Sequence, residues 1–214
     1  AIAVQADTRA LVLVGGSFTT VNGAARANLA RLLPDGSTDA AFAPTVGVVR
    51  QLVVQGDGKI VVLADGSGVR SPVSRLNVNG TAAATFTAFN GGSAAINAIA
   101  VQADGRILVG GSLTGFARRL NPNGSLDTTF NVGDGANEYV GPIAIQSDGK
   151  IIIGGAFTSY NGAGRNRVAR ILGGTTTNII ENTFESLISV HPNPTNGLVF
   201  FDLGADFKEI KINV

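Results

Sequence analysis

The chain has 214 residues and a formal net charge of +1, with 44% hydrophobic residues, 29 glycines and no Cys, Met or Trp. The lack of cysteine excludes disulfide bonds and thiolate metal sites, and so small a charge on scattered arginines argues against nucleic-acid binding. No apolar run approaches the roughly 20 residues of a membrane-spanning helix. The abundant glycine and the scarcity of helix formers predict an all-β protein.

One phrase occurs four times along the first 155 residues. Its copies read IAVQADTRALVLVGG, LVVQGDGKIVVLADG, IAVQADGRILVGG and IAIQSDGKIIIGG, with glutamines at Gln5, Gln55, Gln102 and Gln146. Two apolar runs around an Asp-Gly dipeptide predict a β-hairpin with a two-residue type I′ turn. Because the runs barely alternate with polar residues, we expect both faces of each hairpin to be covered.

A second phrase follows each copy and contains a recurring arginine. It reads ARLLPDGSTDAAF, SRLNVNGTAAATF, RRLNPNGSLDTTF and a shortened ARILGG, with Arg31, Arg75, Arg119 and Arg170. A residue that recurs in every copy favours a structural role over a unique site. We expect the planar guanidinium to bind strand-end carbonyls or a carboxylate such as Asp39 or Asp127.

The glutamines are 44 to 50 residues apart, a period typical of four-stranded propeller blades. Together the two phrases resemble the delta-60 repeat family over residues 1–172. The resemblance implies a β-propeller, usually on a bacterial surface or in a secreted protein, and no defined chemistry. Because ARILGG lacks the strand that ends in Phe, we expect a partial ring or a fragment of a larger propeller.

The turns allow an alternative reading as calcium sites. NPNGSLD contains oxygen-bearing side chains at Asn121, Asn123, Ser125 and Asp127. A calcium loop needs several carboxylates and usually a bidentate Glu, whereas Asn and Asp commonly cap their own turns. We therefore interpret these residues as turn caps and expect no cofactor, with calcium as the alternative.

The sequence offers little for catalysis. His191 is the single histidine, so a nucleophile–base triad is excluded within this chain. No carboxylate pair for glycoside hydrolysis stands out from the turn carboxylates. The paired glycines after each hairpin are interpreted as crowded backbone rather than a phosphate loop, because no helix follows them. We predict that the chain is not an enzyme.

The loops that follow the paired glycines differ most between copies. SFTTVNGAARAN and AFTSYNGAGRNR are long, whereas SLTGFA is short. In a propeller such loops gather on one face, where ligands bind. Aromatic residues and arginines are enriched at binding hot spots, which makes Arg26, Tyr160, Arg165 and Arg167 the candidate ligand-face residues. A solvated loop residue is the alternative for each.

The repeats end at residue 174, and residues 175–186 form a predicted linker rich in Thr and Asn. From residue 187 three strands are predicted: ISV, LVFFDL and EIKINV. Before the second strand stands HPNPTNG, in which Pro192, Asn193, Pro194 and Gly197 match the opening of the type IX secretion system C-terminal sorting domain. This resemblance implies the start of a small immunoglobulin-like β-sandwich in residues 187–214, an outer-membrane shuttle protein and a surface sortase as partners, and a Bacteroidota-like source.

The sequence therefore predicts a non-enzymatic β-propeller that is exported by type IX secretion and acts in adhesion, or in binding a surface glycan or protein. We expect it to be secreted or to lie on the outer face of the outer membrane of a Gram-negative bacterium. One alternative is an accessory domain of a larger secreted enzyme, such as a glycoside hydrolase or peptidase. A structural spacer is another.

Overall fold

The computed structural model describes residues 1–5, 10–66, 72–92, 94–113, 115 and 117–172, and three later strands at 189–191, 198–202 and 210–213. The chain divides into two compact units, Ala1–Ile179 and Ile180–Val214. Within the described ranges no helix could span a membrane.

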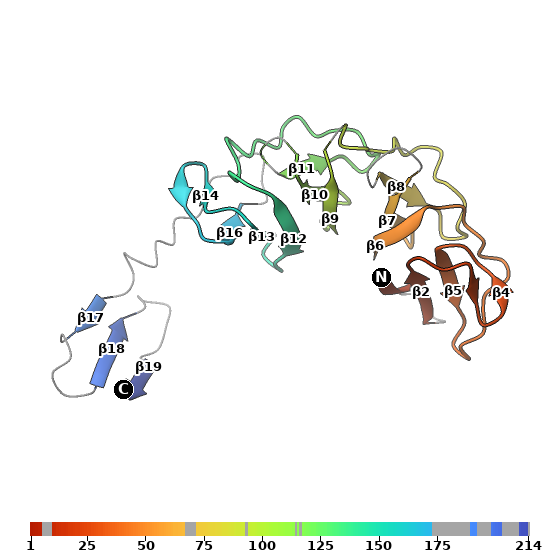
Figure 1. Ribbon diagram of the computed structural model, residues 1–214, viewed down its shortest axis with the longest axis horizontal. Coiled ribbons are helices and arrows are strands. Elements are labelled where there is room, and N and C mark those ends of the chain that lie inside the picture. Colours follow the sequence, from red (N-terminus) through yellow and green to blue (C-terminus); the bar gives the residue numbers. More distant parts are fainter. Residues whose placement is uncertain are drawn as a thin grey trace. The chain divides into compact units, whose positions relative to one another are not determined.

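Unit 1 contains four three-stranded antiparallel sheets, one for each copy of the repeat (Figure 1). We refer to residues 1–42, 48–86, 96–130 and 140–172 as repeats 1 to 4. The sheets consist of β1 (Ile2–Gln5), β2 (Leu11–Gly15) and β5 (Leu29–Leu32); β6 (Val48–Val54), β7 (Ile60–Asp65) and β8 (Val73–Leu76); β9 (Ile96–Val101), β10 (Ile107–Gly111) and β11 (Ala117–Leu120); and β12 (Val140–Ile145), β13 (Ile151–Gly155) and β16 (Val168–Ile171).

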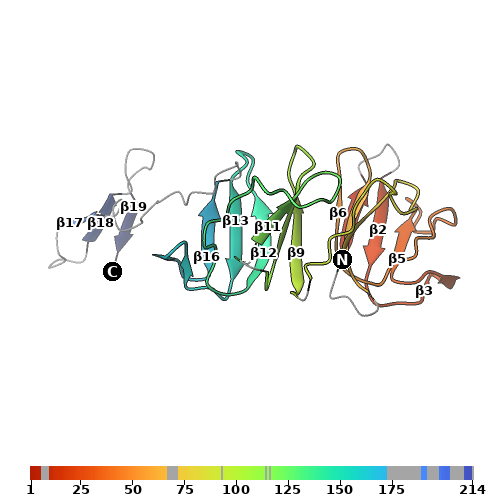
Figure 2. The ribbon, with the colours of Figure 1, turned by 90° about the horizontal axis from the view of Figure 1, so that it is seen from above.

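Two small hairpins lie in the long loops of repeats 1 and 4. They are β3 (Thr20–Val21) with β4 (Ala24–Ala25), and β14 (Ser159–Tyr160) with β15 (Ala163–Gly164). The four predicted hairpins of the first phrase are confirmed, because the first two strands of every sheet pair antiparallel. Figure 2 shows β12, β13 and β16 running side by side in one such sheet.

The fourth strand predicted for repeats 1 to 3 is reduced to a single bridge. Thr38 pairs with Leu32, and repeats 2 and 3 form the same bridge through Ala82 and Leu126. The segment after this bridge turns away at once, because the backbone N–H of Phe42 donates to the carbonyl of Asp39 at 3.3 Å. The sheets are therefore three-stranded, and the segment that ends in Phe packs against the sheet as a loop.

The Asp-Gly turns also differ from the predicted type. The N–H of Gly58 donates to the carbonyl of Gln55 at 2.9 Å, and the N–H of Gln55 donates to the carbonyl of Lys59 at 2.8 Å. In the turn only Gly58 has a positive φ, at 79°, so this is a type I turn followed by a left-handed glycine bulge rather than type I′. The carboxylate of Asp57 accepts the N–H of Lys59, which holds the aspartate in place before the glycine.

Hydrophobic side chains form three separate clusters, each between two neighbouring repeats. One cluster joins repeats 1 and 2, the next joins repeats 2 and 3, and the last joins repeats 3 and 4. The strands of the inner repeats are accordingly covered on both faces, as the unbroken apolar runs predict: β10 is buried along its whole length. The first strands also contact one another, β6 with β9 and β9 with β12.

The paired glycines permit this close packing. A Cβ atom added to Gly15 would lie 2.5 Å from Cγ1 of Val49 in the next repeat, and one added to Gly111 would lie 2.0 Å from the carbonyl oxygen of Ala95. The strand pairing also shifts register between Gly110 and Gly111. The interpretation as crowded backbone and bulge is confirmed.

Unit 2 is described only by its three strands, β17 (Ser189–His191), β18 (Leu198–Asp202) and β19 (Ile210–Asn213), which form one antiparallel sheet in that order. They overlap the three predicted strands, with bounds that differ by one residue. An immunoglobulin-like sandwich is not shown by this single sheet. The sorting-motif residues Pro192, Asn193, Pro194 and Gly197 lie outside the described residues.

Candidate binding site

The recurring arginine links repeat 1 to repeat 2 and repeat 2 to repeat 3. Arg31 is 5% exposed, and its Nη1 donates to the carbonyl of Val78 in repeat 2 at 2.6 Å and to Oε1 of Gln5 at 3.2 Å. Its Nε donates to Oδ2 of Asp39 at 2.9 Å. The guanidinium lies 4.4 Å from the ring centre of Phe42. One side chain thus binds a carbonyl, a carboxylate and an aromatic face.

Repeats 2 and 3 each contain part of this arrangement. Arg75 donates to the carbonyl of Pro122 in repeat 3 at 2.7 Å, and Arg119 donates to Oδ2 of Asp127 at 2.8 Å. Arg119 also lies over the ring of Phe130, 4.5 Å from its centre. The predicted structural role is confirmed for these arginines, because their donors bind a carbonyl of the next repeat or a carboxylate of their own repeat.

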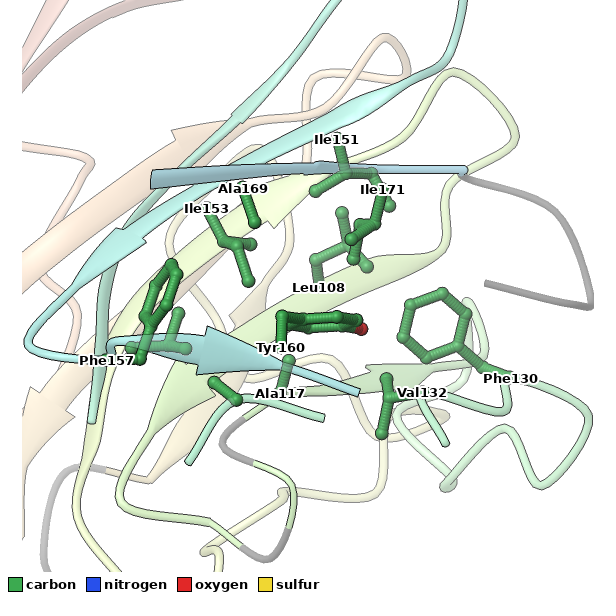
Figure 3. Close-up of a cluster of buried hydrophobic side chains, with 12 residues drawn as sticks. Leu108, Ala117, Phe130, Val132, Ile151, Ile153, Phe157, Tyr160, Ala169 and Ile171 are labelled. Carbon is green, nitrogen blue, oxygen red and sulfur yellow. The ribbon is translucent and has the colours of Figure 1, made fainter. Parts of the chain in front are cut away.

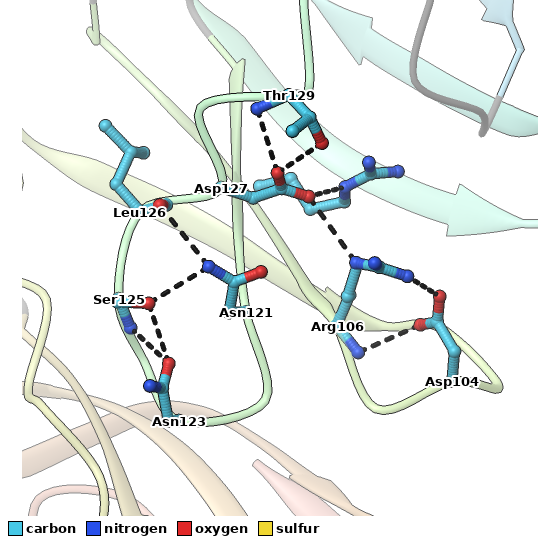
Figure 4. Close-up of polar contacts among 9 residues, drawn as sticks. Asp104, Arg106, Asn121, Asn123, Ser125, Leu126, Asp127 and Thr129 are labelled. Carbon is cyan, nitrogen blue, oxygen red and sulfur yellow. Dashed lines mark hydrogen bonds and ion pairs between the residues drawn. The ribbon is translucent and has the colours of Figure 1, made fainter.

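The turn oxygens of NPNGSLD are occupied by hydrogen bonds within the turn (Figure 4). Oδ1 of Asn123 accepts the N–H and the hydroxyl of Ser125, and the Asn121 amide donates to the Ser125 hydroxyl at 3.0 Å. Asp127 accepts the N–H and the hydroxyl of Thr129. These contacts confirm the interpretation of the side chains as turn caps. No cluster of three or more His, Cys, Asp or Glu that could hold a metal occurs in the part of the chain that is described.

Asp127 is held as a carboxylate. Burial by itself raises the pKa of its carboxyl group, but the hydrogen bonds from Thr129 and Arg119 lower it by more, so the pKa lies below the ordinary value. The Arg106 guanidinium adds an ion pair to the same carboxylate at 3.4 Å. A buried aspartate of this kind is unsuited to act as a general acid near neutral pH.

The four candidate ligand-face residues do not form one surface. Tyr160 has no exposed surface, and its ring lies within the cluster between repeats 3 and 4 (Figure 3). Arg26 donates to the carbonyls of Ala25, Asp39 and Ala40 in repeat 1. Arg165 donates to the carbonyl of Gly164, and Arg167 is exposed. Repeats 2 and 3 separate Arg26 from the other three residues.

A different group of residues surrounds a pocket of about 350 Å³ at the start of the first strands of repeats 2, 3 and 4. The lining residues are Gln51, Asn97, Ala98, Tyr139, Gly141, Pro142 and Ile143. The pocket exists because β6, β9 and β12 contact one another in succession. Gln51, Ala98 and Pro142 each stand four residues before the glutamine of their repeat, so equivalent positions of three repeats meet here.

Gln51 fixes one wall of the pocket. Its side-chain amide donates to the carbonyl of Ile99 at 2.8 Å and accepts the N–H of Ile99 at 2.8 Å. This paired contact joins β6 to β9 across two repeats. Ala98 in repeat 3 is too short to reach β12 in the same way, and Pro142 in repeat 4 provides an exposed apolar ring. The space that longer side chains would fill remains open.

Tyr139 and Asn97 supply the unused polar groups. A Cβ atom added to Gly141 would lie 2.5 Å from the Tyr139 hydroxyl, so the missing side chain at Gly141 lets the phenol lie over its own strand. The Tyr139 carbonyl accepts the N–H of Ala156 at 3.0 Å, which anchors the backbone. Asn97 is exposed and Tyr139 half-buried, and neither side chain bonds another described residue.

The chemistry of the pocket is neutral. Its lining combines the Asn97 amide, the Tyr139 phenol and the apolar groups of Pro142 and Ile143. The Gln51 amide also lines the pocket, but it is already bonded to Ile99 of β9. No charged side chain is among the lining residues. Such a surface can orient a ligand by a few hydrogen bonds over an apolar floor. The described lining offers no carboxylate or imidazole that could transfer a proton.

Three segments of the chain, residues 12–42, 102–130 and 146–173, match the family model described as a β-propeller domain of unknown function, DUF5122. The matched segments are similar to the repeats of this family. The segments fall in repeats 1, 3 and 4, and the unmatched repeat 2 is the one with Ala83 where repeats 1 and 3 have Asp39 and Asp127. No curated protein matches the chain significantly.

Solved structures show the same fold at low identity. The chain is similar to a protein of unknown function from Bacteroides caccae, at 15% identity and a TM-score of 0.51 over 99% of this chain and 76% of that one. It is also similar to the extracellular domain assigned to a hybrid two-component system of B. thetaiotaomicron, at 11% identity and a TM-score of 0.52 over 100% of this chain and 30% of that one. Virginiamycin B lyase from Staphylococcus aureus is 15% identical, with a TM-score of 0.53 over 99% of this chain and 65% of the lyase.

Proposed function

We propose that this β-propeller domain is a non-catalytic module that binds a neutral, hydroxyl-rich ligand, such as a sugar unit of a surface glycan. The observation that carries the proposal is the uncharged pocket with the Tyr139 hydroxyl and the Asn97 amide at its rim. Its volume of about 350 Å³ is at the lower end of the range for small-ligand sites, which suits one or two sugar rings rather than a long peptide.

The residue types support a sugar more than a charged ligand. The ring face of a sugar is apolar and packs on surfaces such as Pro142 and the Tyr139 ring, while its hydroxyl groups bind amides and phenols. A phosphate or carboxylate would be left without a cationic partner among the lining residues, at a large desolvation cost. Adhesion to a glycan surface is the role that follows.

Calorimetric titration of the purified chain with a panel of neutral oligosaccharides tests this function. Removal of one neutral hydrogen bond costs about 0.5–1.5 kcal/mol, so we expect Tyr139→Phe and Asn97→Ala each to weaken binding about three- to tenfold. Asn166→Ala is the matched control, because Asn166 is an exposed asparagine outside the pocket. Binding that both pocket variants leave unchanged, or hydrolysis of the saccharides, would contradict the proposal.

We further propose that the protein is delivered to the cell surface or secreted through the type IX system, with the shuttle protein and the surface sortase as partners. The support is the motif of Pro192, Asn193, Pro194 and Gly197 in the sequence. Replacing Pro192 and Pro194 with alanine in a host that has this system should abolish surface display while leaving the folded repeats intact. Surface display at the normal level would contradict the sorting role.

A further inference from the structure

Repeat 2 has the recurring arginine but lacks the carboxylate that accompanies it in repeats 1 and 3. Arg31 and Arg119 each form an ion pair with the aspartate eight residues later. The residue eight positions after Arg75 is Ala83. Among the described residues Arg75 forms no ion pair, and its Nε is buried without a hydrogen-bond partner. Repeat 2 therefore contains a guanidinium cation without a counter-ion.

The backbone around Ala83 is the same as the backbone that holds Asp127 in repeat 3. The N–H of Ala83 donates to the carbonyl of Arg75 at 2.9 Å, and the N–H of Asp127 donates to the carbonyl of Arg119 at 2.9 Å. The carbonyls of residues 83 and 127 each accept the N–H of the phenylalanine three residues later, at 3.0 and 3.3 Å. A side chain at residue 83 therefore starts from the same place relative to the arginine.

Threonine supplies further donors to this place. In repeat 3 the N–H and the hydroxyl of Thr129 donate to Oδ1 of Asp127, at 3.0 and 2.6 Å. The equivalent residue of repeat 2 is Thr85, whose N–H has no acceptor among the described residues. The Thr85 hydroxyl instead accepts Nη2 of Arg75 at 3.4 Å. In the absence of an aspartate, this long contact replaces a carboxylate.

The guanidinium of repeat 2 is also the most accessible of the three. Arg75 is half-buried, whereas Arg31 and Arg119 are 5% and 3% exposed. The Thr85 side chain that contacts Arg75 is itself exposed. A change of its χ1 rotamer moves the hydroxyl away from the guanidinium and leaves the backbone in place. An anion from the solvent can therefore reach Arg75.

We propose that repeat 2 binds a carboxylate anion of the size of formate, in the place that the carboxylates of Asp39 and Asp127 occupy in repeats 1 and 3. The anion accepts Nε and Nη2 of Arg75, because a guanidinium binds a carboxylate through two parallel N–H donors. It also accepts the N–H of Thr85. Neither Arg75 nor Thr85 lines the pocket of the proposed function, so the two sites are independent.

The Cβ atom of Ala83 restricts the size of the anion. In acetate the methyl group takes the position that Cβ has in an aspartate side chain, and Ala83 already has an atom there. Ala83→Gly removes this atom and should admit acetate. A ligand of three heavy atoms binds no tighter than about 1 mM, so we expect a dissociation constant for formate in the millimolar range.

Binding should stabilise the fold at the junction of repeats 2 and 3, because Arg75 also donates to the carbonyl of Pro122 in repeat 3 at 2.7 Å. At a formate concentration ten times the dissociation constant, the folding equilibrium constant of the wild type should rise about 11-fold. Ala83→Asp carries its own carboxylate, so formate should not stabilise this variant beyond the general effect of the salt.

A formate titration followed by ¹⁵N-resolved NMR tests the site directly. The signals of the Arg75 Nε–H and the Thr85 amide should shift and saturate in the wild type. Ala83→Asn fills the space with a neutral side chain of the same shape and should abolish the shifts. Ala84→Asn makes the same change at the exposed neighbouring residue and should retain them. Ala83→Asp, which restores the pattern of repeats 1 and 3, replaces Ala83→Asn if that variant does not fold.

Two results would overturn the proposal. One is the absence of saturable shifts in the folded wild type at formate concentrations up to about 100 mM, well above the millimolar range expected for so small a ligand. The other is shifts of equal size in the wild type and in Ala83→Asn, which would place the anion elsewhere. Acetate should shift the Thr85 signal of Ala83→Gly and not that of the wild type, and equal binding to both would contradict the size limit.

Discussion

The arginine contacts of repeats 1 and 3 differ from those of repeat 2 at one position. Arg31 and Arg119 each bind an aspartate eight residues later, whereas Arg75 has Ala83 there. The backbone is the same in all three, because the N–H of Ala83 donates to the carbonyl of Arg75 at 2.9 Å, as the N–H of Asp39 does to Arg31 at 2.8 Å. Arg75 also lies over Phe86, 5.0 Å from its ring centre.

This comparison separates two roles of the recurring arginine. Arg75 has lost its carboxylate and retains the bond to the next repeat, so the link between repeats does not require an ion pair. What repeat 2 lacks is a partner for Nε of Arg75, which is buried without a hydrogen bond. The aspartate therefore satisfies the guanidinium inside its own repeat. The difference predicts a graded series of effects on stability.

Asp127→Ala should have the largest effect. It leaves Arg119, which is 3% exposed, without a carboxylate in the interface of repeats 3 and 4, and breaking one half of a buried ion pair typically costs about 3–5 kcal/mol. Chemical denaturation measures the loss. If the free energy of unfolding falls by no more than it does for the exposed Asp148→Ala, the buried pair does not stabilise the repeat.

Asp39→Ala should have a smaller effect of the same sign. The Asp39 side chain is 12% exposed, against 4% for Asp127, and Arg31 retains Gln5 and the Val78 carbonyl. We expect a loss of about 1–3 kcal/mol, the cost of leaving a partly buried donor unsatisfied. A loss greater than that of Asp127→Ala, measured in the same denaturation series, would contradict the link between burial and effect.

Ala83→Asp should convert repeat 2 to the pattern of repeats 1 and 3. The new carboxylate would accept Nε of Arg75 and, from the other side, the N–H of Thr85, as Asp127 accepts that of Thr129. We expect a gain of about 1 kcal/mol, the net value of a typical hydrogen bond, seen as a higher midpoint of unfolding. Ala84→Asp places the same charge one residue away and should give no gain.

The acid sensitivity of these variants is the smallest effect. The folded-state pKa of Asp127 lies below its ordinary value, so its contribution is complete above about pH 4, the unfolded value, and is lost as the pH falls through the folded-state pKa. The stability difference between the wild type and Asp127→Asn should therefore shrink below about pH 4. Ala83→Asp should acquire the same dependence, and a gain that persists at low pH would show that the ion pair is not its cause.

Much of the fold could be predicted from the internal copies of the repeat. The hairpins, the structural arginines and the capped turns all follow from residue types that recur at fixed spacing. The turn type could not be predicted, because Asp-Gly fits both a type I′ turn and a type I turn with a glycine bulge. The choice is made by the Asp57 carboxylate, which binds the N–H of Lys59. Tyr160 was assigned to the surface because a loop surrounds it, yet packing between repeats 3 and 4 buries it.

The pocket was missed for a different reason. Its residues belong to no motif and come together only because three first strands converge. A usable signal was present: Gln51, Ala98 and Pro142 occupy equivalent positions and share no chemistry, directly before a phrase that repeats closely. Positions that vary within a repeated strand therefore indicate a surface that is free of packing constraints. Arg26 and Arg165 were chosen as candidates because they lie in long loops. The length of a loop shows only that the fold accepts inserted residues there.

The three hydrophobic clusters share no residue, and this arrangement affects how the domain opens. Each repeat is stabilised by hydrophobic contacts with its direct neighbours only, as in other linear repeat arrays. Amide hydrogens should therefore exchange slowest in β7 and β10, which have a neighbouring sheet on either side. Partial opening would proceed one sheet at a time, so one repeat can open while the strands around Gln51 and Asn97 remain folded.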